Sequence, residues 1–420
     1  MDLQPVKGTR DFYPEEMRLR NWLFGIWRDT ARQFGFEEYD ACVLESEELY
    51  VRKAGDEITE QLYNFEDKGG RKLALRPEMT PSLARMVLQR KNALALPIKW
   101  FSIPQCFRYE RMTRGRKREH FQWNADVIGQ PGLTAEVEVI SLLLMAMQKM
   151  GLNETHIRLR LNDRRLLGAV LEHLGIEEAA HAPVMVVMDK RDKISTEALA
   201  NLLKEQGLND TQVTGLNHLL GLHTLEELEA ELGAIEPIAD LRQLMRLLEE
   251  SGFGGYAAFD ISIVRGLSYY TGTVFEIADR AGQLRAICGG GRYDQLLSSF
   301  GGEATPMVGF GFGDVVIMEL LADLKLTPTL TSGVDVAVLP FGAEQVPTAL
   351  RLAQALRQKG QRVECDLSLR KLKKTLQRAE GLGAASVYLL LPDELEKGEV
   401  VHRDMATRQE ERVALASLLP

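Results

Sequence analysis

The stretch WFSIPQCFRYERMTRGRKREHFQWNADVIG, from Trp100 to Gly129, decides the fold of this chain. It contains two runs of alternating polar and apolar residues, 98–108 and 121–128, on either side of a very basic loop. Alternating runs that are separated by a polar loop predict the two antiparallel strands of a hairpin. We therefore expect an antiparallel sheet to lie at the centre of the protein.

This hairpin would gather polar groups on one platform, because residues two apart on a strand share a face. Arg108 and Glu110 would point one way together, and so would Gln122, Asn124 and Asp126. The cations of the loop between the strands are Arg111, Arg114, Arg116, Lys117 and Arg118. Guanidinium groups bind phosphates well. The pattern predicts a site that holds a polyphosphate beside a small polar molecule; the alternative is a solvated hairpin with a charged tip.

The composition of the whole chain excludes several classes of protein. With 420 residues the chain is long enough for two or three domains, and its net charge of −9 provides no general attraction for nucleic acid. The four cysteines, at positions 42, 106, 288 and 365, are far apart and form no CxxC pair. A zinc site or a disulfide framework is therefore not expected, and we predict no metal site.

The chain also has no apolar run long enough to span a bilayer, and its first residues, MDLQPVKGTRDFYPEEM, do not have the pattern of a signal or transit peptide. These features predict a cytoplasmic protein that does not associate with membranes.

Apolar periodicity outlines the elements around the hairpin. It predicts helices at 14–34 and 135–150 and short strands at 38–44 and 72–76. From about 165 to 252 the chain is rich in Leu and Glu, which indicates a helical insertion.

Strand-like patterns return at 257–277 and 284–291, and a helix is expected at 314–324. The segment LTPTLTSG at 326–333 is typical of a linker. Strands then alternate with helices from 334 to 420, which predicts a small α/β domain.

Three further motifs lie in the strand-rich part that follows the insertion. They are RGLSYYTGTVFE from Arg265 to Glu276, CGGGRYD from Cys288 to Asp294, and VGFGFG at 308–313. None of the glycine-rich segments is a Walker A or GxGxxG sequence, which disfavours a P-loop or Rossmann nucleotide site. No Ser/His/Asp order stands out, so a nucleophilic triad has little support.

Taken in order, LRPEMT, FRYER…HFQWNAD, VRGLSYY, GGGRYD and GFGFG resemble the histidyl-tRNA synthetase family, which is part of class II of the aminoacyl-tRNA synthetases. The resemblance spans essentially the whole chain. It implies an α+β fold with an antiparallel sheet flanked by helices. The catalytic core would cover 1–325, with the helical insertion at about 165–252. After the linker at 326–333, an anticodon-binding α/β domain would cover 334–420.

The activity implied by this resemblance is that of a histidine–tRNA ligase. Histidine and ATP, accompanied by Mg²⁺, would form histidyl-adenylate, and the histidyl group would pass to the 3′ end of tRNA(His). A homodimer is also implied. One alternative is the synthetase-like regulatory paralogue of ATP phosphoribosyltransferase, and another is a synthetase of the same class for a different amino acid.

The resemblance also assigns roles to residues of the motifs. Arg108 and Arg265 would be catalytic and contact the α-phosphate, Glu110 would accept a hydrogen bond from the adenine amino group, Arg116 would bind the distal phosphates, and His120 would stack on the base. The histidine site would consist of Glu78, Thr80, Gln122, Asp126, Tyr269, Tyr270 and Tyr293.

Within the histidine site, Glu78 and Thr80 would bind the α-amino group, Gln122 and Asp126 would bind the imidazole nitrogens, and the tyrosines would close the pocket. In the C-terminal domain, Lys371, Lys373 and Lys374 would contact tRNA phosphates.

Some positions depart from the family pattern. Val316 stands where the third class motif usually carries an arginine that stacks on adenine, and His120 stands where an aromatic residue usually lies under the base. Cys42 replaces a proline of the interface strand, and Asp126 replaces a glutamate found in many relatives. The first two departures concern the adenine site.

Overall fold

The computed structural model describes residues 3–51, 60–188, 191, 194–263 and 269–419. The contacts between Cα atoms divide the chain into two compact units. One unit comprises Met1–Asp11 and Leu23–Thr327, and the other comprises Phe12–Trp22 and Pro328–Pro420. Each unit has a sheet and a hydrophobic core.

The first unit is built on a nine-stranded sheet. Its strands are β1 (Glu37–Glu38), β5 (Ile98–Ser102), β6 (Gln105–Phe107), β7 (Glu119–Ile128), β8 (Ile157–Asp163), β9 (Ala257–Phe259), β10 (Thr273–Asp279), β11 (Cys288–Arg292) and β12 (Met307–Gly313). Their order is β1-β5-β7-β12-β11-β10-β8-β9, and β6 also pairs with β7. Among the strands of the described residues, only β1–β5 and β8–β9 of this sheet are parallel pairs, so the predicted antiparallel sheet is confirmed.

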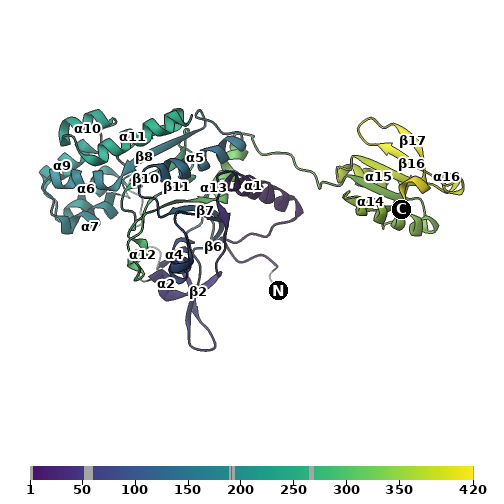
Figure 1. The fold of residues 1–420 in the computed structure, drawn as a ribbon, viewed down its shortest axis with the longest axis horizontal. Coiled ribbons are helices and arrows are strands. Elements are labelled where there is room, and N and C mark those ends of the chain that lie inside the picture. Colours follow the sequence, from purple (N-terminus) through teal and green to yellow (C-terminus); the bar gives the residue numbers. More distant parts are fainter. Residues whose placement is uncertain (1–2, 52–59, 189–190, 192–193, 264–268, 420) are drawn as a thin grey trace. The chain divides into compact units, whose positions relative to one another are not determined.

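Helices cover this sheet, as Figure 1 shows. They are α1 (Pro14–Gln33), α5 (Thr134–Lys149) and α13 (Asp314–Asp323). The helix α5 is apolar around most of its circumference, and it is buried against β7 and β12. In the second half of α1, Trp27 stacks on Trp123 of β7 with ring centroids 5.8 Å apart.

The predicted helical insertion is also observed. Its helices are α6 (Arg164–His173), α7 (Glu178–Met188), α8 (Thr196–Glu205), α9 (Asp210–Leu219), α10 (Leu225–Leu232) and α11 (Glu236–Glu250). Asn209 and Thr224 start α9 and α10 with complete capping boxes, which explains why the Leu- and Glu-rich sequence breaks into short helices there. Both α6 and α11 pack on β8, which lies next to the edge strand β9 of the large sheet.

A small three-stranded sheet lies beside the large one. Its elements and neighbours are β2 (Leu44–Ser46), β3 (Tyr63–Glu66), β4 (Lys72–Leu75), α2 (Glu47–Val51), α4 (Thr80–Gln89) and α12 (Leu296–Ser299), with the 3-10 helix η1 (Lys91–Ala93). The 3-10 helix η3 (Gly254–Tyr256) packs on α11 and β8 of the large sheet. The single strand predicted at 38–44 is wrong, because β1 and β2 are separate strands of different sheets. Between them, the Arg76 guanidinium binds Asp40 and the Ala41 carbonyl, in place of a neighbouring strand.

The predicted hairpin needs a correction in its first strand. That strand is divided into β5 and β6 at Pro104, which has no N–H to donate to a sheet ladder. As a result, Arg108 and Glu110 lie just beyond β6 instead of on a strand. The strand predicted from 284 begins at Cys288, because Asp279 accepts hydrogen bonds from the backbone N–H groups of Gln283 and Leu284 and holds a turn.

The second unit contains the predicted α/β domain. Its elements are β13 (Val336–Pro340), η4 (Ala343–Gln345), α14 (Val346–Gln358), β14 (Val363–Cys365), α15 (Leu372–Gly381), β15 (Ser386–Leu390), α16 (Pro392–Glu396), β16 (Glu399–Asp404), β17 (Glu410–Ala414) and α17 (Leu415–Leu418). The order β14-β13-β15-β16-β17 is parallel up to β15 and then antiparallel. Alternate residues of β13 enter two clusters, with Val338 on one face and Leu339 on the other, so the sheet is covered on both faces. The last two strands were not predicted.

Candidate active site

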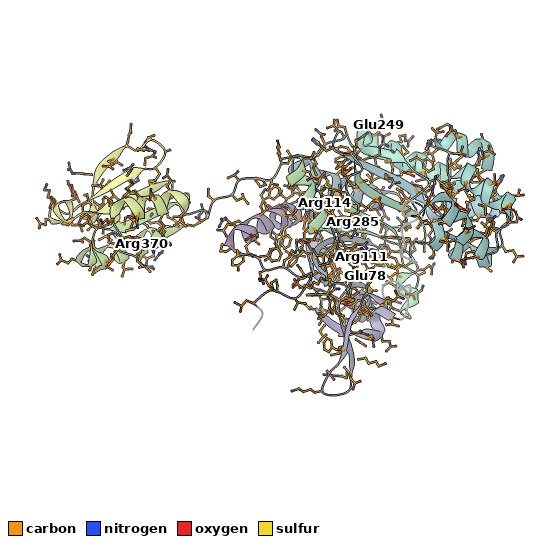
Figure 2. All side chains as sticks on the ribbon, turned by 180° about the vertical axis from the view of Figure 1, so that it is seen from behind. Glu78, Arg111, Arg114, Glu249, Arg285 and Arg370 are labelled. Carbon is orange, nitrogen blue, oxygen red and sulfur yellow. The ribbon has the colours of Figure 1, made fainter. Side chains whose placement is uncertain are left out.

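A cavity of about 1420 Å³ opens over the central strands of the large sheet. Its wall includes the predicted ATP-site residues Arg108, Glu110, Arg116 and His120 and the predicted histidine-site residues Glu78, Thr80, Gln122, Asp126, Tyr269, Tyr270 and Tyr293. Arg265 lies outside the described residues. Lys371, Lys373 and Lys374 belong to the second unit and are exposed. Figure 2 shows Glu78 and Arg285 in the first unit and Arg370 in the second.

Strand β7 presents the polar side of the cavity because its side chains alternate. Gln122, Asn124 and Asp126 line the cavity, whereas Trp123 and Ala125 are fully buried on the opposite face. The neighbouring strand β12 places glycines opposite these residues, so no side chain from β12 fills the space above the sheet there. Sequence alternation thus explains how three polar side chains from one strand reach the site.

Glycine is sterically required at position 309 of β12, whereas a side chain at position 311 would displace the end of Gln122. A Cβ added to Gly309 would overlap the Asp126 carboxylate and would lie 2.6 Å from the Tyr293 hydroxyl oxygen. A Cβ added to Gly311 would lie 2.9 Å from Gln122 Nε2. The glycines therefore allow the acid and the amide to lie across the sheet.

Asp126 is the most perturbed acid in the cavity. The Tyr293 hydroxyl donates a short hydrogen bond to Asp126 Oδ1, while the buried Oδ2 has no hydrogen-bond partner among the described residues. Burial raises the pKa of Asp126 to about 7, and the Tyr293 hydrogen bond opposes that rise. One carboxylate oxygen thus remains available to a donor that enters the cavity.

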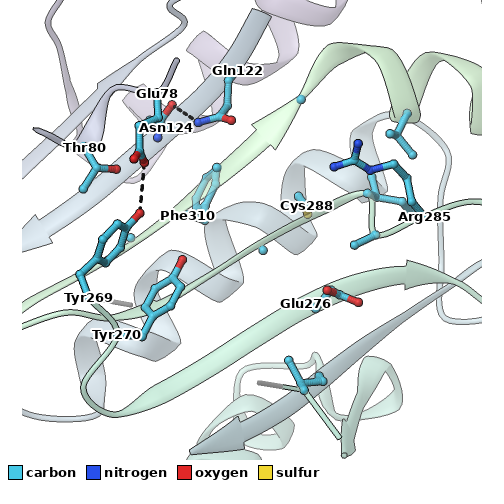
Figure 3. A pocket seen from close by; sticks show the side chains of 18 of the residues that line it. Glu78, Thr80, Gln122, Asn124, Tyr269, Tyr270, Glu276, Arg285, Cys288 and Phe310 are labelled. Atoms are coloured by element: carbon cyan, nitrogen blue, oxygen red, sulfur yellow. Dashed lines mark hydrogen bonds between the residues drawn. The ribbon is translucent and has the colours of Figure 1, made fainter. Parts of the chain in front are cut away.

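Glu78 forms a second acidic point nearby. Its Oε2 accepts a hydrogen bond of 3.2 Å from the Tyr269 hydroxyl, as the dashed line in Figure 3 shows. Burial raises the pKa of Glu78, while the charge of Arg108 and the Tyr269 hydrogen bond act in the opposite direction. A cationic amine bound at this end of the cavity would therefore stabilise the ionised form of Glu78.

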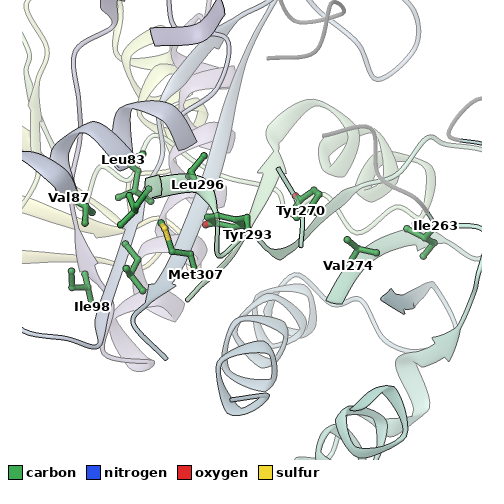
Figure 4. Packing of buried hydrophobic residues seen from close by; sticks show 12 residues of the cluster. Leu83, Val87, Ile98, Ile263, Tyr270, Val274, Tyr293, Leu296 and Met307 are labelled. Carbon is green, nitrogen blue, oxygen red and sulfur yellow. The ribbon is translucent and has the colours of Figure 1, made fainter. Parts of the chain in front are cut away.

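The tyrosines connect the site to the core. Tyr269 lies with its ring centroid 5.6 Å from that of Tyr293 and 5.1 Å from that of Tyr270. Tyr270 and Tyr293 also belong to a buried cluster with Leu83 and Met307, shown in Figure 4. Because the rings are packed on their apolar sides, their hydroxyl groups are held in place.

A chain of amide and imidazole contacts continues along β7. Gln122 Nε2 donates to Asn124 Oδ1 over 3.0 Å, and Gln122 Oε1 lies 3.4 Å from His120 Nε2. Burial, followed by the positive charge of Arg108, lowers the pKa of His120 to about 3. The imidazole is therefore neutral at physiological pH and can present an uncharged ring face.

The other end of the cavity is cationic and is formed by a loop. Arg108 Nε donates to the Pro77 carbonyl over 2.9 Å, which directs this guanidinium along the wall next to Glu78. Arg116 Nε lies 2.9 Å from Glu110 Oε2. Cations that are fixed in this way suit phosphate groups and developing negative charge.

The basic loop is tied to α13 at its tip. Arg114 pairs with Glu319 at 2.7 Å and with Asp323 at 2.6 Å, and the Gly115 N–H donates to Glu319 Oε1 over 3.0 Å. The loop is thus attached to a helix that begins directly after β12. The hairpin is more than a solvated charged tip, because Arg116 and Lys117 line the cavity and Arg114 binds that helix. Of the other basic residues of the loop, Arg111 is exposed and Arg118 packs over the Tyr109 ring.

Sequence reasoning missed several residues of the wall. Asn124 appeared on the predicted polar face but received no role. Arg160 bridges Asp260 at 2.8 Å and Glu276 at 3.1 Å across β8 and β10, although nothing in the sequence relates these positions. Arg285 also lines the cavity, and only its place just before the CGGGRYD motif could have drawn attention to it.

Two general features of the described residues bear on the site. Within these parts of the chain, no group of three or more His, Cys, Asp or Glu side chains could hold a metal ion. Over the same residues, no helix combines the length and the apolarity needed to cross a membrane.

Comparison with known proteins gives consistent matches over the whole length. A profile of the family described as histidyl-tRNA synthetase matches residues 8–313, and a profile of an anticodon binding domain matches 335–420. The chloroplastic/mitochondrial histidine–tRNA ligase of Arabidopsis thaliana is 46% identical over 419 residues, which cover 100% of this chain and 86% of that protein. The histidine–tRNA ligase of Opitutus terrae is 43% identical over 414 residues, which cover 97% of this chain and 95% of that protein. A solved histidyl-tRNA synthetase from Nostoc sp. PCC 7120 has the same fold, with a TM-score of 0.82, 24% identity, and coverage of 100% and 98% of the two chains.

Proposed function

This chain belongs to the histidyl-tRNA synthetase family and has the function of a histidine–tRNA ligase, and from this premise we propose which of its residues carry each part of the reaction. Its substrates are histidine, ATP and tRNA. The match to an anticodon binding domain argues against the regulatory paralogue of ATP phosphoribosyltransferase as an alternative.

The proposal for the histidine site rests above all on Asp126. One oxygen of this buried carboxylate is held by Tyr293 and the other has no partner among the described residues, so it can accept a hydrogen bond from an imidazole N–H. Gln122 on the same face of β7 would bind the second imidazole nitrogen. A site that hydrogen-bonds both nitrogens rejects analogues that lack them by on the order of 10⁴-fold.

The α-amino group of histidine would bind at Glu78 and Thr80. Burial disfavours the charge of Glu78 in the empty cavity, and an ammonium group would restore it. Tyr269, which already donates to Glu78, would orient the carboxylate, and Tyr270 would complete the wall.

For ATP, we propose that Arg108 holds the α-phosphate while the histidine carboxylate attacks it, the bond to the β-phosphate breaks and pyrophosphate leaves. This position is supported by its bond to the Pro77 carbonyl, which directs the guanidinium next to Glu78 and thus next to the amino acid. No protein nucleophile is needed, because the main requirement is positive charge where negative charge develops. For Arg265, the second catalytic arginine, the role stays the prediction made from sequence.

The remaining ATP contacts would come from the basic loop and the start of β7. Arg116 would bind the distal phosphates, Glu110 would accept from the adenine amino group, and His120 would stack on the base as a neutral ring. Mg²⁺ would accompany ATP. In such sites it is bound mainly by phosphates with one or two carboxylates, and the ion would neutralise phosphate charge.

The second unit would bind tRNA through Lys371, Lys373 and Lys374, which are exposed at the start of α15. Replacement of all three by Ala should raise the KM for tRNA and reduce the salt dependence of tRNA binding, with adenylate formation unchanged. Arg378 of the same helix pairs with Glu364 at 2.8 Å, so Arg378→Ala is a matched control with a smaller expected effect.

Three broader proposals complete the assignment. We propose a homodimer, which sedimentation or light scattering would test. A cytoplasmic location is supported by four free cysteines, and cell fractionation would test it. We also propose a catalytic core of 1–325 and an anticodon-binding domain of 334–420, joined by a linker.

The decisive experiment is histidine-dependent exchange of pyrophosphate into ATP by the purified protein. We expect exchange with histidine and background exchange with every other amino acid, and we expect Asp126→Asn to reduce kcat/KM for histidine by about 10³-fold or more. Protein that binds histidine but supports no exchange would contradict the proposed roles of the arginines.

A further inference from the structure

Arg285 is one of the cations of the cavity wall to which the roles proposed above assign no ligand contact. Arg285 lies three residues before β11, and its side chain is exposed to the cavity that it lines. Figure 3 shows its guanidinium turned toward the pocket, at the end away from Glu78 and Tyr269. Arg285 thus belongs to the part of the cavity that is assigned to ATP.

The neighbours of Arg285 come from two other elements. A Cβ built on Gly115 would lie 3.2 Å from Val316 Cγ2 and 3.7 Å from both Cγ and Cδ of Arg285. The backbone of the basic loop, the Val316 side chain and the aliphatic stem of Arg285 therefore meet at one place. Gly115 has a φ of 72°, and its lack of a side chain allows this close approach.

The position of this wall does not depend on a ligand. The Gly115 N–H is bonded to Glu319, which lies three residues after Val316 on α13, and Arg114 is paired with the same helix. The wall is also close to His120, since the charge of Arg285 is among the effects, after burial and Arg108, that lower the pKa of that imidazole.

The chemistry of this wall suits a nucleobase better than a phosphate. Val316 and the Cα of Gly115 offer apolar contacts and no hydrogen-bond donor from a side chain. A guanidinium is planar and weakly hydrated, and it packs on flat aromatic rings through cation–π and stacking interactions. The cations suited to phosphate, Arg108 and Arg116, lie elsewhere on the wall, beside the Pro77 carbonyl and Glu110.

We propose that Arg285 binds the adenine ring of ATP through the plane of its guanidinium, together with His120 and against the apolar wall of Val316. This inference rests on the proposed function, because that function supplies ATP to the cavity. It also explains why a valine is suitable at position 316. An arginine there would meet the Gly115 backbone and would bring a second positive charge against Arg285.

The test uses Arg285→Ala and Arg285→Lys in the full-length protein, with histidine-dependent pyrophosphate exchange as the assay. The KM for ATP and the inhibition constant of adenosine, which has no phosphate, should both rise about tenfold in Arg285→Ala. The KM for histidine should change less than twofold. Arg285→Lys retains the charge but not the plane, so it should lose most of the same affinity.

A matched control is Arg280→Ala, since Arg280 lines the same cavity but its Nε is bonded to the Ile157 carbonyl at the β8 edge. It should leave the adenosine inhibition constant unchanged. If Arg285→Ala raised the KM for ATP without affecting adenosine, Arg285 would contact phosphate and the proposal would be wrong. Unchanged constants for both ligands, or a Lys variant equal to the wild type, would overturn it as well. Lack of exchange in the wild type would instead contradict the proposed function.

Discussion

The two ends of the active-site cavity are built in opposite ways. At the histidine end, Asp126 and Glu78 are buried, come from the sheet and its neighbouring segment, and already accept hydrogen bonds from tyrosines. At the ATP end, Arg116 and Arg114 come from a loop, are partly exposed and are paired with acids. In the proposed assignment, selectivity therefore depends on buried groups of the sheet, whereas charge neutralisation depends on partly exposed groups of a loop.

The reason lies in the cost of burial. A buried polar group must be paired, so a ligand that fails to pair with it is strongly rejected. An exposed cation loses little when its partner changes, and salt screens its interactions. We therefore expect substitutions at the histidine end to act mainly on selectivity and pH dependence, and those on the loop to act mainly on ATP affinity and salt dependence.

The largest effect should come from Asp126→Asn. The amide would present a donor or a neutral acceptor where the imidazole N–H needs a carboxylate, and kcat/KM for histidine should fall about 10³-fold or more. Because the ATP end is separate, the KM for ATP should stay within about twofold. Exchange kinetics with each substrate varied in turn would measure both values. An equal loss of affinity for histidine and for ATP would contradict the separation of the two ends.

Arg108→Ala should have the next largest effect. Its guanidinium is where the two ends meet, since it faces the proposed α-phosphate site and also lowers the pKa of Glu78. Loss of a charge that stabilises the transition state should reduce kcat by about 10² to 10³-fold. Single-turnover adenylate formation would show this directly, and a change confined to the KM for ATP would contradict the assigned role.

Tyr293→Phe should give an intermediate effect with a pH signature. Histidine binding requires ionised Asp126, whose pKa of about 7 means that kcat/KM for histidine rises with pH until about 7 and then levels off. Loss of the Tyr293 hydrogen bond removes a stabilising contact to the ionised form, so the pKa of Asp126 should rise and the inflection should move to higher pH. In Tyr293→Phe, kcat/KM for histidine at pH 7 should fall about tenfold.

This pH profile needs one control, because histidine titrates as well. Asp126→Asn has no group to titrate at this position and should show only the inflection of the substrate. An unchanged inflection in Tyr293→Phe would mean that Asp126 does not control the pH dependence.

The smallest effect should come from Arg114→Ala. This variant releases the loop from α13, but the ion pairs involved are about half exposed, with 54% of the Arg114 side chain accessible. Such exposed pairs contribute little, so the KM for ATP should rise at most about fivefold. The difference from the wild type should shrink at high salt. Arg71→Ala, which breaks a similar exposed pair with Asp67, should leave the KM unchanged.

For the proposed histidine end of the cavity, the sequence pattern predicted the side-chain arrangement of one element only, the strand that became β7. The period of two along 121–128 places Gln122 and Asp126 on one face, and the structure confirms it. The partner of Asp126, Tyr293, is 167 positions away, and no local pattern relates the two residues. Only the family resemblance brought them together, because such contacts arise from strand order.

The limits elsewhere have equally specific causes. Pro104 divides the first hairpin strand because it has no N–H to donate to a sheet ladder, and this break can be predicted from the sequence. Strands β16 and β17 carry many charged residues, and β17 is an exposed edge, so the apolar signal was weak there. Arg285 lies in a turn that is held by Asp279, and nothing in the sequence predicts which wall such a turn reaches.

The glycines of β12 have a consequence for how this gene can vary. Every missense change at the Gly309 codon adds at least a β-carbon, and that atom would overlap Asp126, the acid proposed to bind imidazole. The constraint at Gly311 is weaker, because its neighbour is the end of the Gln122 side chain, which can shift. A single nucleotide change at the Gly309 codon is therefore not a route to a different amino acid preference. Substitutions should instead accumulate in the codons of the basic loop, where each one should change ATP affinity only slightly.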